Sequence, residues 1–441
     1  MSHTPRNRAI VLGLAALVIL TLVHWSHRRS QASGSHADEA YWVGSAYYFD
    51  LLFLQGERRH EDWQLLPGRE NPALGKHVIG AWLTLSGHRT PTLDRIGLFL
   101  AHFSRAPGAW GDEADQRKRE DVVQRVSPDA VRDYLQAGEI TWEPGLLAAA
   151  RRLNHVFHAL NMMVVLALGW CLRGAVAGFV AMLITGCHPL VTQHAFWINI
   201  DLIALFFVTA TALALHRVEQ LGATTSRPRG ALLVLLGGGC LAFACGSKMN
   251  ASVIALVTAG CWLGALAGWS RERARRAPLL VLTGMIVLSL VLFVALNPTL
   301  HSDPLDGMLA LIAEPRRTVE IQSAFLQGYL SEPLDRFLAL GRRMLASQHP
   351  WLAIVIAAGL GQQVVMTLRR RRLDLVMAWW LVALVAVGLW LPFDWPRYSL
   401  PIVPPTALLV GRAAEDLFRT LRGRWRGGTS PVPGATGDAP G

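Results

Sequence analysis

An adjacent acidic pair stands where a carboxylate could act on a bound hydroxyl group. Asp38-Glu39 follows the first apolar segment of the chain by about a dozen residues. A carboxylate held within hydrogen-bond reach can accept the proton of a nucleophilic hydroxyl. An acidic pair in a loop is more often simply solvated, so these two residues alone leave both interpretations open.

A third carboxylate begins an apolar segment further along the chain. Asp201 lies in Ile198-Asn199-Ile200-Asp201-Leu202, and uninterrupted apolar sequence follows it. An acid at the centre of a membrane helix costs about 2.5–3.5 kcal/mol, and intramembrane acids are candidates for function by default. Aspartate is also a favoured helix N-cap. The sequence therefore leaves a functional carboxylate and a capping residue as equal alternatives.

Basic residues occupy the ends of other apolar segments. Lys248 lies in a short turn between two such segments, Arg397 precedes the last one, and Arg151-Arg152 opens the second. Lysines at span ends commonly extend their amine to the interface, and Asp394 is a ready partner for Arg397. Positive charge is disfavoured in short outer loops, so a bound anion is the alternative explanation.

These carboxylates and cations are expected to meet at one interface between the bilayer and the outer helices. An anionic lipid head group would reach that interface laterally, and the cations would neutralise its phosphate. A nearby carboxylate could then activate a hydroxyl acceptor.

Histidines and cysteines give little indication of a metal site. His155 and His158 lie three residues apart, and His188 and His194 flank a turn, but no carboxylate or cysteine stands at ligand spacing beside them. Packing is the favoured explanation. The five cysteines fall within or at the ends of apolar segments and form no CxxC motif, so neither a disulfide framework nor a zinc site is indicated. The need for a divalent metal stays open.

The elements that position these residues are predicted to be membrane helices. Of 441 residues, 52% are hydrophobic and 17% charged, against roughly 25% charged in soluble domains. The apolar residues gather into segments close to the ~20 residues that cross a bilayer. We predict an all-α integral membrane bundle of about ten spans, near residues 9–25, 153–172, 174–192, 198–216, 230–246, 249–269, 278–297, 350–368, 374–393 and 398–413.

The arginine-rich short connections predict the orientation. Cytoplasmic loops are enriched in Lys and Arg, which places both termini in the cytoplasm and the residues discussed above on the outer side of the cell (inner) membrane. The same connections account for the net charge of +11 without a nucleic-acid partner. The arginines in these cytoplasmic connections and the tail are Arg173, Arg217, Arg227, Arg229, Arg271, Arg273, Arg275, Arg276, Arg369 to Arg372, Arg419, Arg422, Arg424 and Arg426.

Four parts of the chain follow from this assignment. They are an N-terminus and first helix (1–25), a large outer loop (26–152), the remaining spans with an outer loop at 298–349 (153–413), and a cytoplasmic tail, partly disordered (414–441).

Two segments of the large outer loop are expected to be interfacial helices. Residues 40–54 are rich in aromatic side chains, whereas 72–87 are apolar, too short to span, and interrupted by Lys76 and His77.

At these residues the chain resembles the polyprenyl-phosphate-dependent glycosyltransferases of the GT-C fold. Within them it resembles the protein O-mannosyltransferase group and its aminoarabinose-transferase relatives. The matches run in order and share one face: Asp38-Glu39-Ala40-Tyr41, Asn71-Pro72-Ala73-Leu74-Gly75-Lys76, Ala150-Arg151-Arg152-Leu153, Asp201, Lys248 and Trp395-Pro396-Arg397-Tyr398. Ala73 and Asn71 depart from the family's His-Pro-Pro pattern, and residues 88–148 are extra sequence.

The resemblance implies a sugar transfer from polyprenyl phosphate to a hydroxyl acceptor, with inversion at the sugar. It implies Asp38 as the base, Glu39 as an aid to holding the acceptor, and Asp201 as a residue that shapes the site. Arg152, Lys76 and Lys248 become candidates for the donor phosphate, with Arg397 next. It names neither the sugar nor the acceptor.

Two other functions compete with this one. A transporter or lipid-binding membrane protein would show repeated halves and broken spans around a midplane site, whereas here the polar residues lie at the outer boundary. An outer-face glycan ligase would use the same cations and carboxylates, and the sequence separates it poorly from the transferase.

Overall fold

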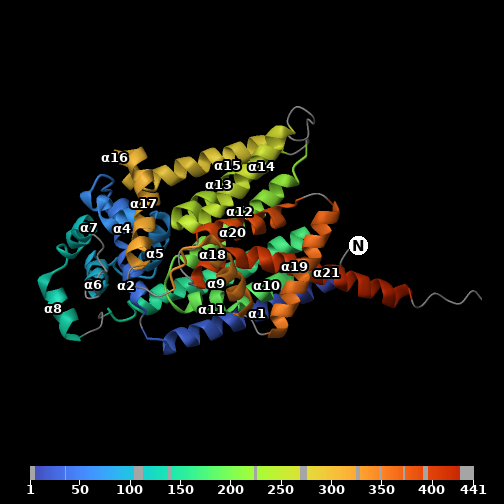
Figure 1. Cartoon of the computed structure of the whole chain (residues 1–441), viewed down its shortest axis with the longest axis horizontal. Helices are drawn as coiled ribbons and strands as arrows, with labels where there is room; N and C mark the ends of the chain where they lie inside the picture. The colour runs from blue at the N-terminus through green and yellow to red at the C-terminus, as the bar shows by residue number, and fades with distance from the viewer. Residues whose placement is uncertain are drawn as a thin grey trace, which may run out of the picture.

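The computed structural model consists of helices throughout the part of the chain that it describes. That part comprises residues 5–34, 36–103, 113–137, 142–222, 226–268, 276–323, 328–346, 350–370, 373–390 and 396–427. The expected all-α class is confirmed for these residues. Figure 1 shows the long helices running roughly along one axis, with shorter helices gathered at one end.

Long apolar stretches with no proline beyond the first turn form the helices that can cross a membrane, because about 20 residues at 1.5 Å each span about 30 Å. Six described helices are long and apolar enough by themselves. They are α1 (Pro5–Ala32), α9 (Leu146–Leu172), α12 (Asp201–Glu219), α13 (Arg227–Ser247), α15 (Arg276–Ala295) and the run from η3 (Met249–Ser252) through α14 (Val253–Ala267).

Two bent helix pairs raise this number to as many as eight. α10 (Ala175–Cys187) and α11 (Pro189–Phe196) meet at 55°, and α19 (Pro350–Arg370) and α20 (Leu375–Trp390) meet at 115°. Pro189 begins α11 because proline has no amide hydrogen with which to continue α10. The chain is therefore a multi-pass membrane protein.

The described residues of the ten predicted spans lie mostly in helices, but the described helices that are long and apolar enough to cross number six to eight rather than ten. The predicted span 174–192 is divided at His188, between α10 and α11. The predicted span 398–413 is divided between η5 (Pro396–Ile402) and α21 (Val403–Gly427). α21 does not count as a crossing helix by itself, because its second half is rich in arginine.

Small residues let the central helices approach closely. A Cβ atom on Gly169 of α9 would lie 2.7 Å from the Cα atom of Gly178 in α10, and one on Gly411 of α21 would lie 2.3 Å from the carbonyl oxygen of Ala177. Such contacts are the usual basis of helix packing in membranes, where lipid offers no hydrophobic drive for association. Many leucine and valine side chains on α13, α14 and α15 remain exposed, as expected for a lipid-facing surface.

The first long connection is helical. It contains α2 (Ala37–Gly44), α3 (Tyr47–Phe49), η1 (Asp50–Leu54), η2 (Glu61–Gln64), α4 (Leu66–Glu70), α5 (Leu74–Leu85), α6 (Asp94–Phe103), α7 (Glu113–Val123) and α8 (Pro128–Ala137). The two segments expected at the interface form α2, α3 and η1, and α5. At 12 residues, α5 is about 18 Å long, and it is not among the candidate crossing helices. Its position relative to a bilayer stays a prediction.

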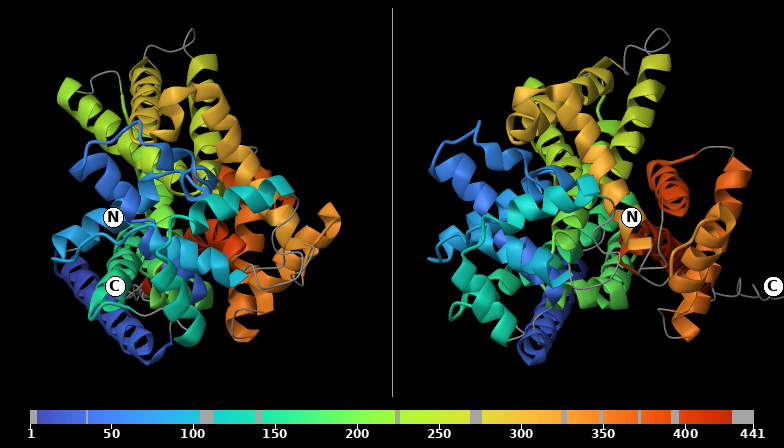
Figure 2. Two further views of the ribbon diagram at one scale, coloured as in Figure 1. Left: turned by 90° about the vertical axis from the view of Figure 1, so that its left-hand side faces the viewer. Right: turned by 60° about the vertical axis from the view of Figure 1, so that its left-hand side comes forward.

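The second long connection, after α15, contains α16 (Thr299–Ser302), α17 (Pro304–Ser323) and α18 (Pro333–Ala346). The right-hand view of Figure 2 shows the blue and cyan helices of the first connection on one side of the bundle and orange α19 on the other.

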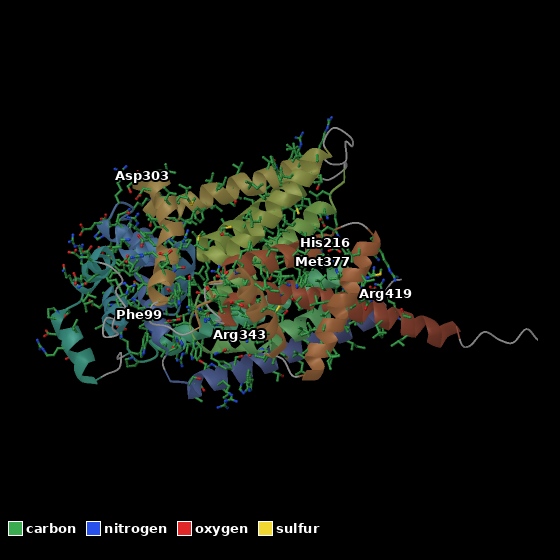
Figure 3. All side chains as sticks on the ribbon, viewed as in Figure 1. Phe99, His216, Asp303, Arg343, Met377 and Arg419 are labelled. Carbon is green, nitrogen blue, oxygen red and sulfur yellow. The ribbon has the colours of Figure 1, made fainter. Side chains whose placement is uncertain are left out.

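Different polar contacts lie at the two ends of the bundle. At one end, Arg151 near the start of α9 contacts the backbone of Ser30 near the end of α1. At the opposite end, Arg173 pairs with Asp416 of α21, and Arg419 pairs with Glu415. Figure 3 shows His216 and Arg419 toward this arginine-rich end and Phe99 toward the other.

The arginine-rich end is predicted to face the cytoplasm. We expect single cysteines introduced by Glu219→Cys at the end of α12 and Gln116→Cys on α7 to react with an impermeant maleimide from opposite sides of sealed vesicles. Both positions are exposed, so access to the reagent depends on the side of the membrane. Labelling of both from the same side would contradict the predicted topology.

Candidate functional site

The acidic pair begins a short helix whose first turn is closed by reciprocal caps. His36 precedes α2, and its Nδ1 accepts a hydrogen bond from the amide of Asp38 at 3.2 Å. Glu39 in turn accepts a hydrogen bond from the His36 amide at 2.8 Å. This capping box satisfies two amides that a helix start leaves without partners. It also holds the two acidic side chains in separate directions.

Glu39 points into the protein and pairs with Arg151. The two groups form a bidentate contact, with Nε to Oε1 at 2.8 Å and Nη2 to Oε2 at 2.7 Å. Their side chains are 0% and 7% exposed. Arg151 also donates to three backbone carbonyls at the end of α1, and Glu39 accepts from the amide of Ile198 at 3.1 Å. One ion pair thus joins α1, α2, α9 and the segment before α12.

Asp38 points the other way, into a cavity of about 820 Å³. Arg397, at the start of η5, donates from Nη1 to Oδ2 of Asp38 at 3.0 Å, and both side chains are about one-third exposed. Asp394, the alternative partner that the sequence suggested, lies outside the described residues. The Arg397 guanidinium also lies 5.7 Å from the ring centre of Tyr398.

A second ion pair lies in the same cavity. Lys248 follows α13 and donates to Oδ1 of Asp201, the first residue of α12, at 2.5 Å. Asp201 is not the residue that caps α12, because Ile200 occupies that position without a side-chain cap. A negative charge in a first helical turn is favoured by the helix dipole. In addition to this effect, the carboxylate of Asp201 forms an ion pair with Lys248.

Of the seven candidate residues, Asp38, Asp201, Lys248 and Arg397 line this cavity. The other three do not. Glu39 is fully buried beside Arg151, and Arg152 is exposed on the outside of α9. Arg151, one position earlier on α9, is buried in the protein interior.

Lys76 is buried beneath the cavity wall. It is 1% exposed, it donates to the backbone carbonyls of Pro67 and Asn71, and it lies 5.0 Å from the Tyr48 ring centre. Burial lowers the pKa of the Lys76 ammonium to about 7, and the nearby Glu70 opposes this shift. Lys76 thus holds the turn between α4 and α5, and two of its three ammonium hydrogens are used there.

The extra segment contributes residues to the cavity wall that the sequence did not reveal. Arg119 of α7 is 8% exposed and lines the cavity, together with Phe99 and Leu100 of α6. Tyr41 of α2 packs edge-on against Phe99, with ring centres 5.5 Å apart, and donates to Glu70 at 2.8 Å. Arg119 stands in a highly charged stretch that resembles a solvated helix, so no sequence signal could have singled it out.

The histidines are used mainly for packing and capping. His155 stacks edge-on against His27 at 5.4 Å, His158 contacts the Gly186 carbonyl at 3.1 Å, and His188 caps α11. His194 lines the cavity. Within the described ranges, no group of three or more His, Cys, Asp or Glu side chains is arranged to hold a metal ion.

The described helices form a GT-C-like bundle. It is similar to that of ArnT from Cupriavidus metallidurans, both bound to undecaprenyl phosphate and in the apo state. The TM-scores are 0.52 and 0.51 at 14% identity, over 91% and 95% of this chain. The chain spans 59% and 62% of the length of those ArnT chains. No family model matches the sequence, and no curated protein matches it.

The buried pair gives a prediction with a matched control. Arg151→Met leaves the charge of Glu39 buried and without its partner, which typically costs about 3–5 kcal/mol. We expect a clear drop in the melting temperature of the purified protein. Arg152→Met removes the same charge one residue later, at an exposed position, and should change stability by less than about 0.5 kcal/mol. Equal effects of the two substitutions would contradict the role given to Arg151.

Proposed function

We propose that this protein transfers a sugar from a polyprenyl-phosphate donor to a hydroxyl acceptor, in the cavity that contains Asp38 and Lys248. The observation that carries the proposal is the pairing of two carboxylates with two cations at one end of a membrane bundle. The fold supports it, since ArnT, which has a similar fold, has been solved with undecaprenyl phosphate bound. We further propose that this end faces the outer side of the cell membrane.

Lys248 and Arg397 are proposed to hold the donor phosphate. Both lie at the ends of helical segments, where a lipid head group arrives from the bilayer while its tail stays in the hydrocarbon. Their aspartate partners keep them charged and in place before the donor binds. A phosphate that enters between them gains two charge-assisted contacts, each typically worth about 1.5–3 kcal/mol.

Asp38 is proposed as the base. In the reaction the acceptor oxygen forms a bond to the anomeric carbon, the bond from that carbon to the phosphate oxygen breaks, and the bonding electrons leave with the phosphate. The hydroxyl proton passes to Asp38. Because attack and departure take place on opposite faces of the sugar, the configuration at the anomeric carbon inverts.

The ion pair between Asp38 and Arg397 connects these two roles. Arg397 has both Asp38 and the cavity within reach, so a bound phosphate competes with Asp38 for its guanidinium. Asp38 is then less tied to Arg397 at the moment when it must accept a proton. Asp201 remains with Lys248 and maintains the shape of the phosphate end.

The base assignment is tested by Asp38→Asn, which preserves size and removes basicity. With a labelled polyprenyl-phosphate sugar and an accepted hydroxyl substrate, turnover should fall by about 10²–10⁴-fold, while donor binding stays within a few-fold. Asp129→Asn, at an exposed position on α8, should leave both unchanged. Unchanged turnover in Asp38→Asn would reject Asp38 as the base.

The phosphate assignment is tested by removing a cation and its partner together. The double variant Lys248→Met/Asp201→Asn leaves no buried charge without a partner, so a folding failure is avoided. We expect donor affinity to fall at least about tenfold, the equivalent of one lost charge-assisted contact. Arg117→Met, at a side chain that is 70% exposed and pairs with Glu113 on the same helix, serves as the control. Wild-type donor affinity in the double variant would place the phosphate elsewhere.

A further inference from the structure

Helix α17 carries a row of exposed apolar side chains. Leu305, Met308, Leu309 and Ile312 are 72%, 36%, 57% and 43% exposed. Their spacing of three, one and three residues places them on one face of a helix. A contiguous apolar row of this kind usually marks a surface that contacts another molecule or a membrane.

The opposite face of the same helix is packed onto the protein. Gly307, Ala310 and Leu311 are buried, and a Cβ atom on Gly307 would lie 2.7 Å from the carbonyl oxygen of Thr299 in α16. Arg69 of α4 also pairs with Asp306 at 3.0 Å. The helix is therefore fixed in orientation, and its apolar row faces away from the described structure.

The row continues the lipid-facing surface of the preceding helix. α15 exposes Leu290 and Val291 at 57% and 58%, followed by Val294 near its end at 41%. α16 then leads directly into α17. In Figure 1 and in the left-hand view of Figure 2, α17 runs across the end of α15 rather than along it. If α15 crosses the bilayer, α17 lies along its surface.

Charge at the end of the row fits the same surface. Arg316 follows Ile312 by one helical turn. Its side chain is 74% exposed, pairs with Glu320 at 3.2 Å and also lines the cavity. An apolar row that ends in an arginine is typical of helices that lie in the interface, where the guanidinium reaches the head groups. α17 is not among the helices apolar enough to cross, and Pro315 interrupts its middle.

We propose that α17 is a membrane-surface helix whose apolar row lies in the acyl boundary of the leaflet that meets the cavity. Its second half contributes Pro315, Thr318 and Val319 to the cavity wall. The bilayer itself therefore supports one wall of the cavity. The proposed partner of α17 is a lipid surface, and this proposal is independent of the proposed reaction.

The experiment places a nitroxide label on single cysteines in a background that lacks the five native cysteines. Leu309→Cys reports on the row, Leu290→Cys on the lipid-facing side of α15, and Gln116→Cys on a water-exposed helix of the same end. The full chain is reconstituted in vesicles of phosphatidylethanolamine and phosphatidylglycerol. Collision rates are measured with dissolved oxygen, which concentrates in lipid, and with a water-soluble nickel chelate.

We expect the oxygen-to-nickel collision ratio at position 309 to be several-fold above that at 116 and below that at 290. A ratio at 309 equal to that at 116 would place the row in water and overturn the proposal. Protection of 309 from both reagents would overturn it as well, since the row would then be covered by protein. None of these readings depends on transferase activity.

Discussion

The buried contact between Arg151 and Glu39 joins the parts of the chain that form the cavity. Arg151 comes from α9, Glu39 from α2, and the carbonyls around them from the end of α1. Glu39 also holds the amide of Ile198, three residues before Asp201. Asp38 and Asp201 are thus both placed relative to one ion pair. Buried charges without partners are costly, so the pair defines a narrow set of arrangements for these segments.

Two further ion pairs line the cavity. Lys248 and Arg397 are each held by an aspartate and line the cavity. The Arg397 and Asp38 side chains are about one-third exposed, whereas those of Lys248 and Asp201 are 15% and 6% exposed. Such pairs keep cations oriented at little cost in reorganisation when an anion arrives. The Arg151–Glu39 pair joins helices in the interior, whereas the other two pairs line the cavity, so similar residue types serve structure in one place and are proposed to serve ligand binding in the other.

The sequence predicts much of this arrangement because the membrane imposes a simple order. Asp201, Lys248 and Arg397 each stand at the end of an apolar run, and alternating helix directions bring such ends together. What it could not predict is rotation about a helix axis. Asp38 and Glu39 are neighbours that point in different directions, and Arg151 rather than Arg152 faces inward. A shift of one residue is about 100° on a helix, finer than apolar periodicity resolves.

The sequence also could not show which charged side chains are buried against short helices. Lys76 had the charge expected of a phosphate ligand, but the carbonyls of Pro67 and Asn71 occupy its ammonium group. The stretch around Arg119 has no regular pattern of apolar residues, so only the structure shows that Arg119 lines the cavity.

The cavity is proposed to recognise the phosphate of a polyprenyl lipid. The most direct measurement compares binding of undecaprenyl phosphate and the neutral undecaprenol to the purified protein by native mass spectrometry. The two ligands share the same tail and differ in the phosphate alone. We predict that undecaprenyl phosphate binds at least about tenfold more tightly than undecaprenol, because its phosphate forms at least one charge-assisted contact. Equal affinity for the two lipids would contradict it.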